Sequence, residues 1–204
     1  TLTGTVTTIG GLGSCTGPQG IAIGLVGGVF PTAFVACSNG EVAVIDAAVD
    51  AFLSSTSFGS GGAFYGVAIT PDDAFVYVTD STNDEFVVLD PGFSPPVEIF
   101  GSPFAAGVTA PHGIVINGNA LTYDSVYIAG SGSDNVIVLS TDNTTVVAGP
   151  ISMGLGSGPE ALAVTPDALG AHVYVTLTGA DQFVVIDDTL ATPAVAPSRT
   201  IDPT

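Results

Sequence analysis

Four residues of different chemical character stand at regular intervals along the chain. The intervals are 46, 47 and 48 residues, and the four are Gln19, Tyr65, His112 and Glu160. If the intervals reflect a structural repeat, these side chains form a ring at one mouth of a central channel. A histidine beside a carboxylate could hold a metal ion or a polar ligand, although two protein ligands are too few for a structural zinc site. The two interpretations are a ligand site and a polar rim that hydrogen-bonds to backbone and water.

Three aspartates, Asp46, Asp90 and Asp187, each end an apolar run at equivalent places in the chain. Carboxylate oxygens are the ligands that calcium prefers. The surrounding loops lack dense Asp-x-Asp-x-Asp spacing, so the alternative is that each carboxylate accepts backbone N–H groups in the following turn. Calcium is therefore the only cofactor candidate, and we expect no other.

The two cysteines, Cys15 and Cys37, flank the first two apolar runs. If these runs are antiparallel neighbours, both residues lie at the same end of the sheet, close enough for a disulfide bond. The sequence therefore predicts a disulfide and an oxidising, extracellular or cell-surface location, with two buried free thiols as the alternative. Asn143, in the triplet Asn-Thr-Thr, is a candidate N-glycosylation site.

The charge balance excludes several classes of function. Asp and Glu number 19 against a single basic residue, Arg199, so the formal net charge is −18. Because nucleic acids and phosphates are bound by Lys and Arg, we expect no nucleic-acid partner. The sequence contains no nucleophile-elbow, P-loop, dinucleotide-binding or zinc-protease motif, so no catalytic residues are predicted. Residues 20–37 are uncharged, but their glycines and Pro31 favour two strands and a turn over membrane insertion.

The elements that must position these residues form a repeat. A lead-in of residues 1–16 precedes four similar units, residues 17–62, 63–109, 110–157 and 158–204. Each unit contains four apolar runs separated by turns, and the period is 46–48 residues. Four short strands at such a period are typical of β-propeller blades. The sequence thus predicts a single all-β domain, a small propeller of four blades with four antiparallel strands each. Its inner strands are expected near 20–24, 66–70, 113–117 and 161–165.

The second and fourth units share a recognisable sequence motif. Residues 66–80 read GVAITPDDAFVYVTD and residues 86–90 read FVVLD, and the fourth unit repeats AVTPD, VYVT and VID. This pattern resembles the YVTN family of β-propeller repeats, which occurs in microbial surface-layer and secreted proteins. Related propellers include lactonases and quinoprotein-like enzymes, but sugar-phosphate lactonases need cationic groups that a chain with Arg199 alone does not supply. Such propellers usually have about seven blades, whereas this chain has four units.

Four units can be completed in three ways: as a closed four-bladed propeller, as half of an eight-bladed dimer, or as an open arc against a neighbour. Residues 3–9 resemble the outermost strand that precedes each repeat, while residues 199–201 are a second candidate for that place in the last unit. One terminal strand is therefore expected either to pair with another subunit or to close the propeller within its own chain.

The surface composition bears on function. Only 10% of residues are charged, against about 25% in ordinary soluble domains, which suits a subunit whose faces are covered by other subunits. We therefore expect a non-enzymatic extracellular structural protein that assembles with itself into a filament or surface layer, through propeller faces and a shared terminal strand. The alternative is a secreted binding module that holds a glycan, peptide or cation at the channel mouth. A lactonase-like hydrolase is the third hypothesis.

Overall fold

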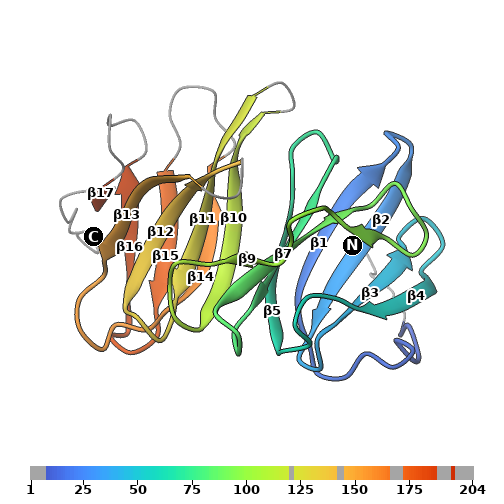
Figure 1. The fold of residues 1–204 in the computed structure, drawn as a ribbon, viewed down its shortest axis with the longest axis horizontal. Helices are drawn as coiled ribbons and strands as arrows, with labels where there is room; N and C mark the ends of the chain where they lie inside the picture. The colour runs from blue at the N-terminus through green and yellow to red at the C-terminus, as the bar shows by residue number, and fades with distance from the viewer. Residues whose placement is uncertain (1–7, 120–121, 142–144, 166–171, 188–193, 196–204) are drawn as a thin grey trace, which may run out of the picture.

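Every regular element in the described part of the chain is a β-strand. The computed structural model describes residues 8–119, 122–141, 145–165, 172–187 and 194–195. Their strands form four antiparallel sheets, one per unit, which stand side by side in a propeller-like arc (Figure 1); each has four strands in sequence order, and the second has a short fifth strand. The predicted all-β class and the four-stranded units are confirmed.

The strand order within each sheet follows the sequence. The first unit contains β1 (Pro18–Val26), β2 (Phe30–Cys37), β3 (Glu41–Asp46) and β4 (Ala51–Ser57). The second contains β5 (Phe64–Ile69), β6 (Val76–Asp80), β7 (Glu85–Asp90) and β8 (Val97–Glu98), and β9 (Phe104–Ala105) also pairs with β7. The third contains β10 (Pro111–Asn119), β11 (Thr122–Gly130), β12 (Asn135–Ser140) and β13 (Val146–Ser152). The fourth contains β14 (Pro159–Val164), β15 (His172–Leu177), β16 (Gln182–Asp187) and β17 (Ala194–Val195).

The innermost strands β1 and β10 cover the segments predicted for them, and β5 and β14 end one residue before the predicted ends, at Ile69 and Val164. The uncharged stretch 20–37 forms two strands and a turn, as its glycines and Pro31 indicate. No helix within the described ranges has the length and hydropathy needed to cross a membrane. In the last sheet the fourth place is taken by β17, and residues 199–201 lie outside the described residues, as do residues 3–7.

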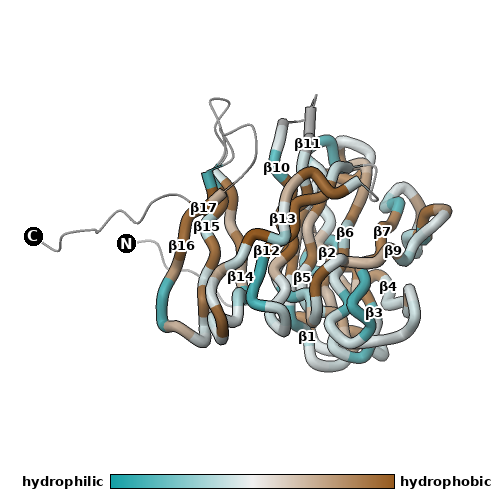
Figure 2. The backbone as a smooth tube through the Cα atoms, turned by 60° about the vertical axis from the view of Figure 1, so that its left-hand side comes forward, coloured by the Kyte–Doolittle hydropathy of each residue, from teal (hydrophilic) through white to brown (hydrophobic). Residues whose placement is uncertain are grey.

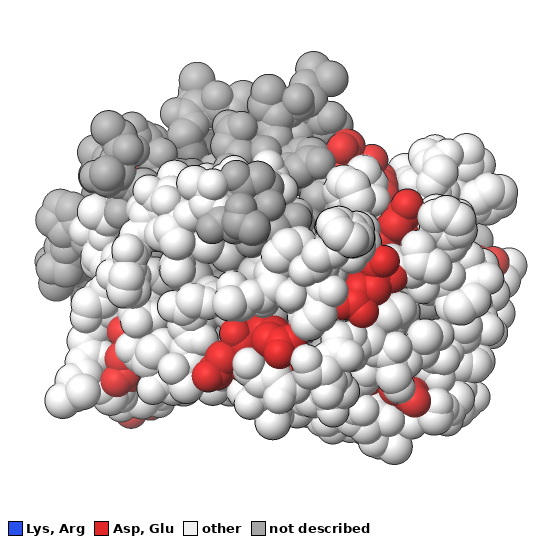
Figure 3. Space-filling view, viewed as in Figure 1, with Lys and Arg blue, Asp and Glu red and all other residues white. Residues whose placement is uncertain are grey.

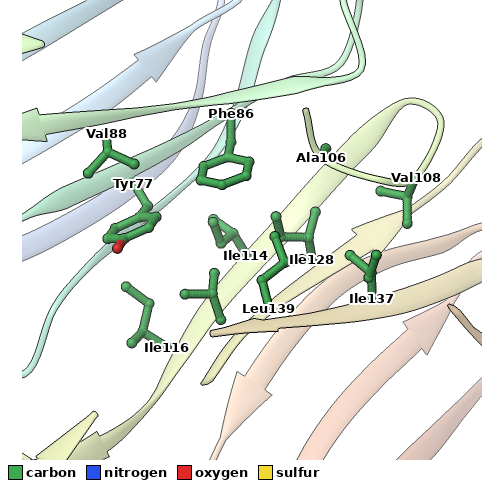
Figure 4. Close-up of a cluster of buried hydrophobic side chains, with 11 residues drawn as sticks. Tyr77, Phe86, Val88, Ala106, Val108, Ile114, Ile116, Ile128, Ile137 and Leu139 are labelled. Carbon is green, nitrogen blue, oxygen red and sulfur yellow. The ribbon is translucent and has the colours of Figure 1, made fainter. Parts of the chain in front are cut away.

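The core lies between successive units. In the cluster between the second and third units, Tyr77, Phe86 and Val88 pack against side chains of β10, β11 and β12 (Figure 4). Similar clusters join the first unit to the second and the third to the fourth. Because the inner units bury both sheet faces in this way, β6, β7 and β12 are buried along most of their length instead of alternating between buried and exposed residues.

Successive inner strands approach so closely that the residue at the contact must be glycine. A Cβ atom on Gly66 would lie 2.3 Å from the carbonyl oxygen of His112. Gly20 and Gly113 face the next unit in the same way, with corresponding distances of 2.6 Å. Alanine occurs at this place only in the fourth unit, as Ala161.

The arc of four sheets is open within the described residues. Strand β5 packs against β1 and β10, and β10 packs against β14, but no comparable contact joins β14 to β1. The first and fourth sheets lie at opposite ends of the molecule (Figures 1 and 2). Each end therefore has a sheet with a neighbour on only one side.

Candidate functional site

Three of the four predicted ring residues meet at the inner strands. The rings of Tyr65 on β5 and His112 on β10 are stacked, with centroids 3.9 Å apart and an angle of 4° between their planes. His112 Nδ1 lies 2.9 Å from Glu160 Oε2 on β14. The hydroxyl group of Tyr65 donates a hydrogen bond to the other oxygen, Glu160 Oε1. This polar cluster therefore joins the second, third and fourth units.

The carboxylate of Glu160 controls the protonation chemistry of the polar cluster. Its hydrogen bond with Tyr65, followed by partial burial and its negative charge, raises the pKa of the Tyr65 hydroxyl to about 12. A carboxylate can only accept, so the contact assigns a proton to Nδ1 of His112. Nε2 has no hydrogen-bond partner among the described residues. The cluster thus presents one imidazole nitrogen that can accept a hydrogen bond from a polar group.

Gln19 does not join the polar cluster. It lies at the start of β1 with an exposed side chain, and it makes no hydrogen bond with another described residue. The repeat spacing places it at the equivalent position of the first unit, but Tyr65 turns towards the third unit and away from it.

Two of the three candidate calcium ligands are used in local turns. Asp46 Oδ1 accepts the N–H of Ala48 at 2.9 Å, and Asp90 Oδ1 accepts that of Gly92 at 2.8 Å. Asp187 ends β16, and no His, Cys, Asp or Glu residues in the described ranges are grouped in threes that could hold a metal ion. The predicted calcium role stays a prediction. Asn143 lies outside the described residues.

The predicted disulfide bond between Cys15 and Cys37 is present, with the two Cα atoms 5.6 Å apart. It fastens the lead-in to the outward side of the first unit, where Ile9 and Leu12 pack against a cluster that includes Val35 and Ile45. The alternative of two free thiols is wrong.

The turns between the second and third strands contain carboxylates with a structural role that the sequence analysis missed. Asp84 and Asp134 occupy the left-handed region, with φ of 57° and 54°. Asp84 accepts the N–H of Ala110 at 2.8 Å, and Asp134 accepts those of Gly156 and Gly158 at 2.7 and 2.9 Å. These bonds, that of Gly158 first, lower the pKa of Asp134. Each carboxylate ties its unit to the connection that leads into the next.

The outward side of the fourth sheet exposes side chains that are buried at equivalent positions elsewhere. Tyr174 is 41% exposed, whereas its counterparts are 0–1% exposed: Phe34, Tyr77 and Tyr127. Phe183 is 54% exposed, whereas its counterparts are fully buried: Val42, Phe86 and Val136. We call the surface formed by Tyr174, Thr176 and Phe183 the last face.

The outward side of β1 shows the same difference. Ile21 and Ile23 are each 62% exposed, while Ile114 and Ile116, at the same register of the third unit, are 5% and 7% exposed. Leu25 continues the row on the same side of the strand and is also exposed. We call the surface formed by Ile21, Ile23 and Leu25 the first face. Both faces are sheet surfaces whose counterparts inside the arc are covered by a neighbouring unit.

Comparison with known proteins identifies the fold. No protein-family model matches the chain, and no curated protein matches it significantly. Hydrazine synthase of Kuenenia stuttgartiensis is similar in structure, with a TM-score of 0.70 and 23% identity over 96% of this chain and 52% of that one. A functionally unknown protein from Desulfotomaculum acetoxidans is also similar in structure, with a TM-score of 0.64 and 15% identity. The match covers 88% of this chain and 55% of that one. The chain therefore spans about half the length of these proteins, and the likeness shows the fold alone.

Proposed function

We propose that this protein is a non-enzymatic, extracellular structural subunit whose four units are blades of a β-propeller and which assembles through its two end faces. The observation that carries this proposal is the exposure of Phe183 and Tyr174 at positions that are buried in every other unit. A contiguous apolar sheet surface of this kind is typical of a protein–protein interface. The resemblance to YVTN-type repeats supports a place among secreted and surface-layer proteins.

The distribution of charge supports the same function. Acidic side chains gather in a few separate groups, and most of the described surface in the view of Figure 3 carries neither charge. The first face contains no ionisable side chain, and the last face contains only the hydroxyl of Tyr174. Surfaces with few long charged side chains lose little side-chain entropy on contact. The disulfide bond supports an extracellular location, because such bonds persist in oxidising compartments.

The test is the mass of the purified chain in solution, measured by light scattering, together with electron microscopy of negatively stained samples. The wild-type chain is expected to form particles larger than its 20.1 kDa monomer. Phe183→Asp places a charge in the last face and should reduce assembly. Phe100→Asp is the matched control, because Phe100 is fully exposed in a loop of the second unit and belongs to neither face. A wild-type chain that remains monomeric contradicts the proposal.

The second candidate function is a secreted binding module, and the polar cluster favours it. Nε2 of His112 is unpaired among the described residues, and the nearby inner-strand position holds the exposed side chain of Gln19. A screen of glycans and peptides with the wild-type chain and the His112→Ala variant tests this candidate. Binding that is lost in His112→Ala but retained in His172→Ala would support it, since His172 lies on β15 and outside the polar cluster. Equal binding by both variants would contradict it.

A further inference from the structure

We propose that two copies of this chain close into one ring of eight units, with the last face of each copy packed on the first face of the other. This inference rests on the proposed function and names its partner and its geometry. The partner is a second copy because each end face matches the surface that the other end requires. The last face repeats the positions with which the third unit contacts the fourth, and the first face repeats those with which the fourth contacts the third.

The hydroxyl group of Thr176, at the last face, is positioned to donate a hydrogen bond to a following unit. In the second unit, Thr79 Oγ1 accepts the N–H of Gly66 at 2.8 Å and donates to the carbonyl oxygen of His112 in the third unit at 2.6 Å. Thr176 holds the same position in the fourth unit, and its Oγ1 accepts the N–H of Ala161 at 3.0 Å. Within the described residues its only acceptor is the carbonyl of Ala161, at 3.5 Å. The carbonyl of Gln19 in a second copy is the equivalent of the carbonyl of His112.

The lead-in is placed like a connection that arrives from a preceding unit. Leu12 stands eight residues before Gly20, as Phe58 does before Gly66 and Met153 before Ala161. Phe58 packs in the cluster between the first and second units, and Met153 packs in that between the third and fourth. Leu12 packs on the first unit in the same manner, held by the disulfide bond. The lead-in therefore completes a surface that a preceding unit can cover.

Side chains from the inner strands of three units meet at one place, because the side chain of Tyr65 reaches Glu160 past the ring of His112. A contact between two different faces closes into a ring when repeated rotation returns to the start.

Ala161 sets the spacing of the junction between copies. The inner strands inside the arc approach across glycine, where a Cβ would lie 2.3–2.6 Å from the carbonyl of the next unit. The Cβ of Ala161 requires the carbonyl of Gln19 to lie farther away than this. The junction between copies is therefore expected to be wider than the three junctions within a copy.

The test is a charge-complementation experiment on the full chain. Ile23→Lys alters the first face and Phe183→Glu alters the last face, and each variant alone is expected to show the mass of one copy. In an equimolar mixture, a ring contains one unaltered junction and one in which the lysine faces the glutamate, so the mass of two copies should return. Leu155→Lys mixed with Phe100→Glu is the control, because both side chains are fully exposed outside the faces and each variant should keep the mass of two copies. Circular dichroism of each variant checks that the strands are intact.

Each outcome separates this inference from the proposed function. A wild-type mass of two copies, restored in the mixture, supports the ring. Fibres or larger particles overturn the ring and leave the proposed structural function standing. A wild-type mass of one copy at every concentration overturns both. A second variant, Thr176→Val, keeps the shape of the face and should weaken association about fivefold, the effect of one lost hydrogen bond. An unchanged dissociation constant contradicts the predicted bond to Gln19.

Discussion

The hydroxyl group of Tyr65 donates a hydrogen bond to the carboxylate of Glu160, although a whole unit separates the two residues in the sequence and in the fold. The bond passes the ring of His112, which is stacked on Tyr65 and paired with the same carboxylate. Three units are therefore joined by side chains as well as by their apolar clusters, and the polar cluster contributes to the stability of the arc.

The polar cluster makes stability depend on alkaline pH. The pKa of Tyr65 is about 12 in the folded chain and 10.0 when unperturbed, so the folded state holds this proton more tightly. The contribution is fully present below pH 10 and is lost as the pH rises towards 12. Denaturant unfolding of the wild type and of Tyr65→Phe should therefore differ by roughly 1 kcal/mol near neutral pH. A difference that persists unchanged above the folded pKa would contradict the assignment.

Asp134 makes the stability of the fold depend on pH in the acidic range. Its contribution is lost as the pH falls, whereas that of Tyr65 is lost as the pH rises. Its pKa is lowered from 3.8 by the N–H groups of Gly158 and Gly156, so the folded state favours the charged form. The contribution is present above pH 3.8 and is lost as the pH falls through the lower folded value. Asp134→Asn tolerates the left-handed backbone and keeps one oxygen, but it lacks the charge. The stability advantage of the wild type over this variant should shrink on acidification, and a constant advantage across the titration would count against this account.

The disulfide bond is expected to contribute about 3 kcal/mol of stability, because it restricts the unfolded chain between positions 22 residues apart. Urea unfolding with and without a reducing agent measures this contribution. The double variant Cys15→Ala, Cys37→Ala serves as the control, since its unfolding midpoint should not respond to the reducing agent. Equal midpoints for the oxidised and reduced wild type would show that the bond does not stabilise the fold.

Gly66→Ala should destabilise the chain by about 1–3 kcal/mol, because the added methyl group would press against the carbonyl of His112. Gly10→Ala is the matched control, since a Cβ at that position meets no atom within 4 Å. Thermal unfolding of the two variants provides the comparison. Similar melting temperatures would mean that the inner strands can separate without cost.

Salt should strengthen association between copies. Each chain has a net charge of −18, so two copies repel one another. Raising the ionic strength from 0.01 M to 0.15 M shortens the screening length from about 30 Å to about 8 Å, while contacts between uncharged faces are little affected. Sedimentation velocity at increasing sodium chloride should show a growing share of the assembled form. Dissociation by salt would indicate that charged groups hold the copies together.

The strands and the disulfide could be predicted from the sequence because both depend on local patterns. Apolar runs between glycine-rich turns fix the strands, and an antiparallel hairpin brings Cys15 to Cys37. The polar cluster could be predicted only in part. The spacing identifies Tyr65, His112 and Glu160 as equivalent residues, but the choice of Glu160 over Gln19 as the partner depends on side-chain direction and on the curvature of the arc.

The openness of the arc and the role of the turn aspartates could not be predicted from the sequence. Both depend on how one unit is placed against the next. A repeat length does not determine the rotation from one unit to the next, so it cannot tell an open arc from a closed ring. An aspartate does recur before the third run in three units, at Asp84, Asp134 and Asp181. The carboxylates of the first two bond to backbone N–H groups more than twenty residues away, which no local pattern reveals.

Pairing confined to each unit has a consequence for how the chain is made. Every described strand pair joins neighbours within one unit, so each sheet can form as soon as its own segment leaves the ribosome. Closing such short loops costs little entropy, and folding dominated by local contacts is fast. The apolar side of a newly formed sheet nevertheless stays uncovered until the next unit arrives. During synthesis, the newest unit therefore always has one uncovered apolar sheet side, which the next unit to emerge covers.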